Sequence, residues 1–361
     1  MSRSRASVLV TVCIGMGMVS GVQAAFRTVS NTPNFPAQYT SLAAAIAASA
    51  NDDVILVAGS ETSYGSVELN KRLTIIGPGY NPNKQSALVA KITTLTFKAP
   101  NSTLDPSGTL LLGLDVTTVR GSISGASAYQ RIQDIVIERC RVGSVEPSFS
   151  KNWTVKNSII DSSLAGAKPP NVCDGLVVAN CIFSGRVSSY DDNDVNALIT
   201  NCIFIRASDA AFTGAVRNVI FTNNIFYGAS PYHAAHEFCT WNHNISCFST
   251  NDNFNLSGTN SGGDNLVGTD PDFVGVVKQA VAFNYTQSFH TNAGSAATGA
   301  GTDATDIGLY GGMYPWPDGG EVPWETSPMP YIPVVEALNI QNANIPEDGT
   351  LNVTIKARTN D

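Results

Sequence analysis

Charged side chains recur at one position of a repeat in this 361-residue chain. The members that could carry chemistry are Lys151, Asp174, Asp194, Arg217, His236 and Glu237. Four of them stand seven residues before a fixed position of the repeat, and Asp194 and His236 stand one residue earlier in their copies. Because neighbouring strands lie about 4.8 Å apart, we expect these side chains to project from one turn edge as a charged stripe.

A stripe of this kind suits a polysaccharide that carries uronic acids. Lys151 or Arg217 would neutralise a uronate, and a carboxylate or bound cation would polarise it. A lyase needs a base beside a group that stabilises the enolate-like charge. Arg217 with Asp194 approximates that set, and Lys151 with Asp174 is a second approximation.

Hydrolysis needs an acid/base group instead, and His236 with Glu237 offers one at the end of the stripe. The alternative interpretation is a ladder of opposite charges on a solvated turn. Each exposed pair in such a ladder contributes under about 1 kcal/mol. The residue types leave the catalytic and the purely structural interpretations open.

An acidic loop precedes one copy of the repeat. Asp191, Asp192 and Asp194 follow two serines and a tyrosine within a few residues. Carboxylate oxygens of this kind suit Ca²⁺, which takes six to eight oxygen ligands. The spacing does not match an EF-hand loop, and the alternative is an ordinary acidic turn. Calcium is the one cofactor that the sequence suggests.

Three of the four histidines fall close together, at His233, His236 and His243. Zinc favours such ligands, but the HAAHE segment is not a zinc-helix pattern, in which Glu directly follows the first of two histidines four residues apart. The repeat also assigns the nearby Cys239 to an inward column, so we expect a core residue there.

Aromatic residues fall into two groups. Phe183, Phe204 and Phe226 share one column of the repeat, and we expect them to stack inside the fold. Three tyrosines lie in loops near the stripe and are candidate platforms for sugar rings: Tyr190, Tyr227 and Tyr232.

The elements that must position these side chains are short strands of a repeat. Six segments align on one anchor column: Cys140, Ser158, Cys181, Cys202, Asn224 and Asn244. The anchors are 18, 23, 21, 22 and 20 residues apart. A period near 21 residues on such short strands predicts a solenoid.

Asparagine dominates the column before the anchor, at Asn157, Asn180, Asn201 and Asn223. Asparagine readily accepts the left-handed conformation, so this column predicts a turn at every rung. The anchors Cys140, Cys181 and Cys202 would stack in parallel, which is a poor geometry for a disulfide, and we expect buried thiols there. The pairing of Cys173, Cys239 and Cys247 stays open.

Residues 1–24 fit a secretory signal peptide, with two arginines, an apolar stretch and small residues before the cleavage point. No later segment is long and apolar enough to predict a transmembrane span. The formal net charge of −8 disfavours nucleic acid as a partner. We therefore expect a secreted or extracellular protein, in the periplasm or at the cell surface.

The remaining chain divides into three parts. Residues 25–312 form the expected solenoid of roughly ten rungs, capped by an alanine-rich helix near 41–50. Residues 313–333 are proline-rich and predict a stiff connector packed on a surface. Residues 334–361 predict a β-hairpin or the start of a further module, which could attach the protein to a cell surface.

The motifs resemble those of a known family. The alanine-rich helix, the DVILVAG and KRLTIIG strands, the N-N/C-x-I-F rungs and the closing GAGTDATDIGLYGG look like the pectin lyase-like proteins exported by bacteria, over about residues 26–312. The resemblance implies an all-β fold, a right-handed parallel β-helix. It also implies one of several functions, since lyases, hydrolases, adhesins and structural surface proteins share this coil.

We therefore expect an exported protein that interacts with polysaccharide, either as a lyase or hydrolase of glycans that contain uronic acids or as a non-catalytic adhesive or structural module. No compact catalytic signature of the family carries over residue by residue.

Overall fold

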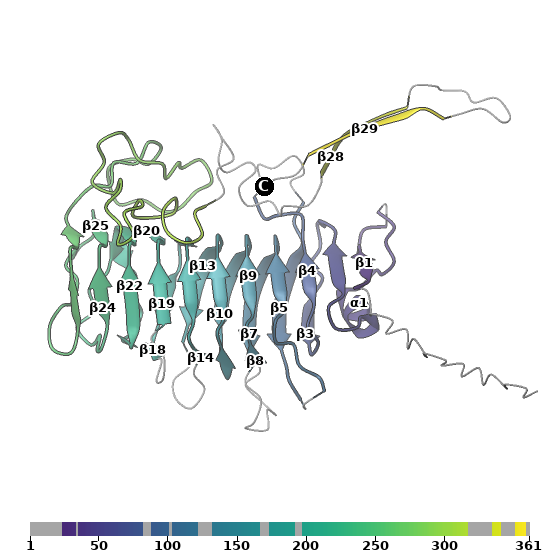
Figure 1. The fold of residues 1–361 in the computed structure, drawn as a ribbon, viewed down its shortest axis with the longest axis horizontal. Helices are drawn as coiled ribbons and strands as arrows, with labels where there is room; N and C mark the ends of the chain where they lie inside the picture. Colours follow the sequence, from purple (N-terminus) through teal and green to yellow (C-terminus); the bar gives the residue numbers. More distant parts are fainter. Residues whose placement is uncertain are drawn as a thin grey trace, which may run out of the picture.

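The computed structural model describes residues 24–33, 35–81, 88–100, 103–121, 132–166, 173–191, 197–316, 334–340 and 351–358. These residues form a parallel β-solenoid, in which each turn of the chain adds one strand to each of two long sheets (Figure 1). The all-β prediction is confirmed, and the expected signal peptide lies outside the described residues.

The first sheet has 11 strands, all parallel to their neighbours. In order these are β1 (Phe26–Val29), β2 (Val54–Val57), β4 (Thr74–Ile76), β6 (Leu110–Leu112), β9 (Val136–Glu138), β12 (Thr154–Lys156), β15 (Val177–Ala179), β19 (Ala197–Thr200), β22 (Val219–Thr222), β24 (Thr240–Asn242) and β26 (Ser261–Gly263).

The second sheet also has 11 strands. They are β3 (Ser66–Leu69), β5 (Lys91–Phe97), β7 (Asp115–Gly121), β10 (Arg141–Glu146), β13 (Ile159–Ala165), β16 (Ile182–Phe183), β20 (Ile203–Ala210), β23 (Ile225–Ser230), β25 (Ile245–Cys247), β27 (Leu266–Val267), and β17 (Arg186–Ser188), which pairs with β13.

Short strands form the third side of the coil. Three of them, β8 (Ile132–Gln133), β11 (Ser150–Lys151) and β14 (Cys173–Asp174), make one sheet, and β18 (Tyr190–Asp191) and β21 (Val216–Arg217) make another. The expected C-terminal hairpin is also present, as the antiparallel pair β28 (Val334–Ile340) and β29 (Val353–Arg358).

The anchor column of the repeat lies inside the coil and is joined from rung to rung. The Cys202 amide donates to Asn224 Oδ1 at 2.9 Å, and the Asn224 amide donates to Asn244 Oδ1 at 3.0 Å. The Asn244 amide donates in turn to Asn265, which extends the column by one member that the alignment missed. Each side chain thus satisfies a buried amide that has no strand partner at the corner.

The other interior predictions also hold. The rings of Phe183 and Phe204 stack at 4.4 Å between centroids, and those of Phe204 and Phe226 at 4.5 Å. Cys140, Cys181 and Cys202 are buried free thiols as expected, and Cys173, Cys239 and Cys247, whose pairing the sequence left open, are buried free thiols as well. Burial raises the pKa of Cys140 to about 12, so this thiol stays protonated and unreactive.

The expected cap is helix α1 (Leu42–Ala48). Ser41 is its N-cap, since its side chain accepts a hydrogen bond from the Ala44 amide. Leu42, Ala45 and Ile46 are buried in the same core as the strands. The Lys71 ammonium donates to carbonyls of the last helical turn, which have no partner within the helix.

The coil ends earlier than expected. Its last strand is β27, and the following segment, residues 268–316, runs back over the outside of the stack along one edge, while β8, β14 and β18 mark the opposite edge (Figure 1). We call residues 268–316 the strap. Its apolar side chains, such as Phe273, Phe289 and Leu309, form a second core against the coil.

The strap lies on a column of outward isoleucines, and the asparagine column holds its backbone. Isoleucine follows the anchor in five rungs and is almost fully buried in each: Ile159, Ile182, Ile203, Ile225 and Ile245. The Asn180 side chain donates to the carbonyls of Leu309 and Gly311 at 2.8 and 2.7 Å. Asn157 and Asn201 bond strap carbonyls in the same way.

No helix in the described part of the chain is long and apolar enough to cross a membrane.

Candidate functional site

The charged stripe lies on the third side of the coil. Lys151 of β11 pairs in register with Gln133 of β8 and with Asp174 of β14. Farther along the stack, Arg217 of β21 pairs with Asp191 of β18 and forms an isolated bridge with Glu237. These two runs of consecutive rungs define the stripe as the structure describes it: Gln133, Lys151, Asp174, Asp191, Arg217 and Glu237.

Strand alternation explains why the stripe faces solvent. The residue before each stripe position points into the coil and is buried: Ile132, Ser150, Cys173, Tyr190, Val216 and His236. Successive strand residues point to opposite faces, so the next residue in each rung must point outward. Lys151 and Arg217 are exposed accordingly and the Glu237 side chain is 43% exposed, whereas Asp174 is only 5% exposed.

The register corrects one member of the stripe. The alignment assigns Asp194 and Val195 to this rung, but the strand that pairs with β21 is Tyr190–Asp191. Asp191 therefore occupies the stripe position beside Arg217. Asp194 itself lies outside the described residues.

The charges at the far end of the stripe are already paired. The Arg217 guanidinium forms an ion pair with the Glu237 carboxylate, and the two side chains are 45% and 43% exposed. An exposed pair contributes little to stability, so it remains available for a ligand. Lys151 has no carboxylate within ion-pair distance in the described part of the chain.

His236 points into the core instead of joining the stripe. Its side chain is 2% exposed, its Nδ1 accepts a hydrogen bond from the Val216 amide at 3.1 Å, and its ring packs edge-on to Phe212. Burial, helped by the nearby His233, lowers the pKa of His236 to about 3. A neutral, inward imidazole cannot exchange protons with a ligand on the outer face, so the predicted acid/base role of His236 has no support in this geometry.

The three histidines do not converge. His243 points toward the strap, where Nδ1 lies 2.8 Å from the Ala300 carbonyl. Across the described residues there is no group of three or more side chains placed to hold a metal ion. The predicted calcium loop is a separate matter, because Asp192 and Asp194 lie outside those residues and Asp191 is described by its backbone only.

Two of the three tyrosines proposed as sugar platforms are core residues. Tyr190 is 3% exposed, and Tyr227 is 1% exposed beneath the strap. Tyr232 is 40% exposed. The sequence analysis did not single out the other exposed aromatic residue of this region, Phe238, at 53%.

A second charged cluster, on the outer face of the second sheet, escaped the sequence analysis. Arg141 of β10 lies between two carboxylates: its Nε is 2.8 Å from Asp161 Oδ2 and its Nη1 is 3.7 Å from Asp115 Oδ2. Burial raises the pKa of Asp115, although Arg141 opposes the shift. Tyr285 of the strap borders the cluster, and burial raises its pKa to about 12.

The signal for this cluster was present in the repeat. Asp115 and Arg141 occupy the position after the anchor, where later rungs carry isoleucine. A change from apolar to charged residues along one column marks the end of a covered surface, and the buried isoleucines of the strap core begin at Ile159, one rung beyond Arg141.

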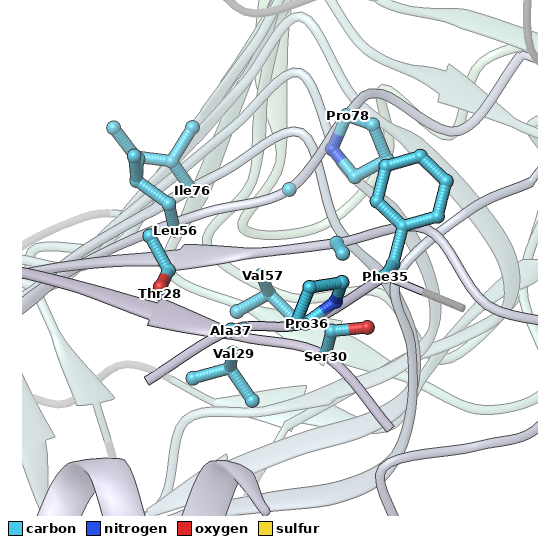
Figure 2. Close-up of a pocket in the computed structure, with 12 residues that line it drawn as sticks. Thr28, Val29, Ser30, Phe35, Pro36, Ala37, Leu56, Val57, Ile76 and Pro78 are labelled. Atoms are coloured by element: carbon cyan, nitrogen blue, oxygen red, sulfur yellow. The ribbon is translucent and has the colours of Figure 1, made fainter. Parts of the chain in front are cut away.

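An apolar hollow of about 320 Å³ lies at the opposite end of the coil from the last rungs (Figure 2). Phe35, Pro36, Leu56, Ile76 and Pro78 line much of it. Its lining carries no ionisable side chain, so it offers no acid, base or charged ligand for catalysis.

No protein-family model matches the chain, and no curated protein sequence is significantly similar to it.

Proposed function

We propose that this protein binds an extended polysaccharide along the charged stripe on the third side of its coil. One observation carries the proposal: the backbone register aligns polar residues in consecutive rungs, at Gln133, Lys151 and Asp174 and again at Asp191, Arg217 and Glu237. Rungs repeat about every 4.8 Å, so a rigid coil presents these groups at the regular intervals that an extended polymer can follow.

The ligand we favour is a glycan that contains uronic acids. Lys151 is exposed and supplies a cation for a uronate, while Arg217 and Glu237 supply donors and acceptors for sugar hydroxyls. The resemblance to the right-handed pectin lyase-like coil supports the same class of ligand. Secretion through a signal peptide over residues 1–24 is part of this proposal, as is calcium at Asp191, Asp192 and Asp194.

Binding without cleavage is the function that the stripe supports best. His236 is buried and neutral, and Glu237 is already paired with Arg217, so the acid/base pair expected for hydrolysis is not free on the outer face. The hairpin of β28 and β29 suits attachment to a larger assembly, because Ile340, Val353 and Ile355 are exposed on it and two strands do not form an independent domain.

Polysaccharide cleavage is the second candidate function, and the Asp115 cluster favours it. A carboxyl group whose pKa is raised by burial can act as a general acid, and Asp161 lies on the other side of the same guanidinium. Cleavage would then occur on the second sheet and not on the stripe.

The test measures binding and turnover together on polygalacturonate, alginate and uncharged cellohexaose. We expect tight binding of an acidic polymer without new ultraviolet absorbance or reducing ends. Lys151→Ala should weaken that binding about fivefold, the loss of one exposed charge contact. The matched control is Lys98→Ala, which removes an exposed lysine paired with Glu68 on the second sheet and should leave binding unchanged.

Turnover that disappears in Asp115→Asn and survives Lys151→Ala would replace the binding proposal with cleavage at the second sheet. Equal effects of Lys151→Ala and Lys98→Ala on affinity would mean that the polysaccharide does not bind at the stripe.

A further inference from the structure

Where the structure describes them, the rungs that carry the stripe have a second left-handed corner, between the third side and the first sheet. We call it the open corner. The residues there with positive φ are Asp134 (57°), Asn152 (55°), Gly175 (71°), Asn218 (56°) and Phe238 (55°). Aspartate, asparagine and glycine tolerate this conformation, but a bulky side chain rarely adopts it. Phe238 is therefore the exception in its own column.

Packing does not account for Phe238. The residue is 53% exposed, so about half of its apolar surface stays in contact with water. Phe248 is also left-handed, with φ of 60°, but its ring packs on Tyr227 at 5.1 Å between centroids. The Phe238 backbone is held in place by its amide, which donates to Thr259 Oγ1 at 2.9 Å. Strained residues that surrounding structure holds in place concentrate at binding sites.

Phe238 directly follows Glu237, at the end of the stripe. The exposed Phe238 is thus the next residue along the chain from the Arg217–Glu237 ion pair, which offers both hydrogen-bond donors and acceptors. A pyranose ring has one apolar C–H face and a rim of hydroxyl groups, and aromatic faces with polar neighbours complement that pattern.

We propose that Phe238 is the aromatic platform of a sugar-binding subsite. The apolar face of one pyranose ring stacks on the Phe238 ring, and hydroxyls of the same sugar bond Arg217 and Glu237. This inference rests on the proposed function, since it adds a subsite to the stripe. It also explains why a residue that fits the corner poorly occupies it.

The test is Phe238→Asn, which restores the residue type that the open corner favours. We expect the melting temperature to rise by about 2 °C, because the relief of backbone strain outweighs the loss of contacts by a ring that is about half exposed. We expect affinity for polygalacturonate or alginate, whichever binds the wild-type protein, to fall about tenfold. Phe238→Tyr should retain the wild-type affinity.

The matched control is Phe248→Asn, at the left-handed phenylalanine that packs on Tyr227. It should lower the melting temperature and leave affinity unchanged. A fall in melting temperature for Phe238→Asn would mean that the ring is structural, and would overturn the proposal.

The remaining outcomes separate the two proposals. Binding that weakens in Lys151→Ala but not in Phe238→Asn retains the stripe and rejects the platform. No binding of polygalacturonate, alginate or cellohexaose by the wild-type protein rejects both. Wild-type dimers that dissociate in Phe238→Asn, measured by sedimentation, would assign the ring to a protein contact and overturn the platform.

Discussion

The two left-handed corners of a rung require the same backbone conformation but have different surroundings. At the corner between the first and second sheets, Asn157, Asn180 and Asn201 donate their side-chain amides to carbonyls of the strap. At the open corner, Asn152 donates to the exposed Asp134 carboxylate of the neighbouring rung. We call the first of these the covered corner.

The residues beside each corner explain the difference. Isoleucine follows the covered corner on the outer face in five rungs, so an uncovered coil would expose a long apolar column that the strap removes from water. The open corner comes directly after the charged stripe. Covering charged side chains would remove no apolar surface from water, so a cover would not stabilise the coil there. The comparison shows that the side chains next to a corner decide its role. An apolar column makes the corner part of a stabilising contact with the strap, and a charged column leaves the corner open to a ligand.

The largest effect that tests this comparison is expected from Ile203→Ala. Ile203 is fully buried between the coil and the strap, so truncation should cost about 3 kcal/mol of unfolding free energy. Urea denaturation measures the loss, and limited proteolysis should show faster cleavage within residues 268–316.

Lys151→Ala is the control on the stripe beside the open corner. Truncation of this exposed side chain should change the free energy of unfolding by less than about 0.5 kcal/mol. Similar losses of unfolding free energy in the two variants would contradict the distinction between the covered corner and the open corner.

The repeat made the coil predictable because its constraints are local. Asparagine before the anchor marks a left-handed corner, and Asn157, Asn180, Asn201 and Asn223 all have positive φ. The phenylalanine column likewise follows from strand alternation, which places every second residue inside. The helix near 41–50 was readable from its alanine content and its serine cap.

The strap was not predicted, because its contacts join residues far apart in sequence. Asn180 and Leu309 meet only after the chain has left the coil and turned back. The isoleucine column could have indicated the strap. Strand alternation places these isoleucines on the outer face, and an apolar column on an outer face implies that another segment covers it. The segment GAGTDATDIGLYGG was read as further coil because its glycines and polar turns resemble rung connections.

The stripe was predictable in position but not in detail. Its columns follow from the repeat, but β18 and β19 are separated by more residues than the corresponding strands of the other rungs, so the alignment chose Asp194 where the structure has Asp191. His236 was assigned to the stripe although it stands one residue earlier, and a shift of one residue reverses the face on which a strand side chain lies.

A smaller effect is expected from the asparagines themselves. Asn180→Ala removes two hydrogen bonds to the strap, and Asn152→Ala removes one exposed bond; both place alanine in a left-handed corner. The corner strain therefore cancels in the comparison, and Asn180→Ala should be less stable than Asn152→Ala by about 1.5 kcal/mol. Urea denaturation of the two variants checks this, and equal stabilities would mean that the asparagine column does not hold the strap.

At neutral pH the smallest effect is expected on the inner side of the stripe, and this effect grows as the pH falls. Burial holds the pKa of His236 at about 3, below its ordinary value near 6.5, so the unfolded chain binds a proton between these values that the folded chain does not. Stability should therefore fall as pH drops below about 6.5, by up to about 1.4 kcal/mol per pH unit from this group. His236→Asn keeps an acceptor for the Val216 amide but does not titrate, so its stability should depend less on pH between 6.5 and 4. The measurement is urea denaturation across that range, with His243→Asn as the control, because His243 is partly exposed beside the strap. A pH dependence that is the same in His236→Asn as in the wild-type protein would mean that His236 reaches water, and that the inner side of the stripe is not closed.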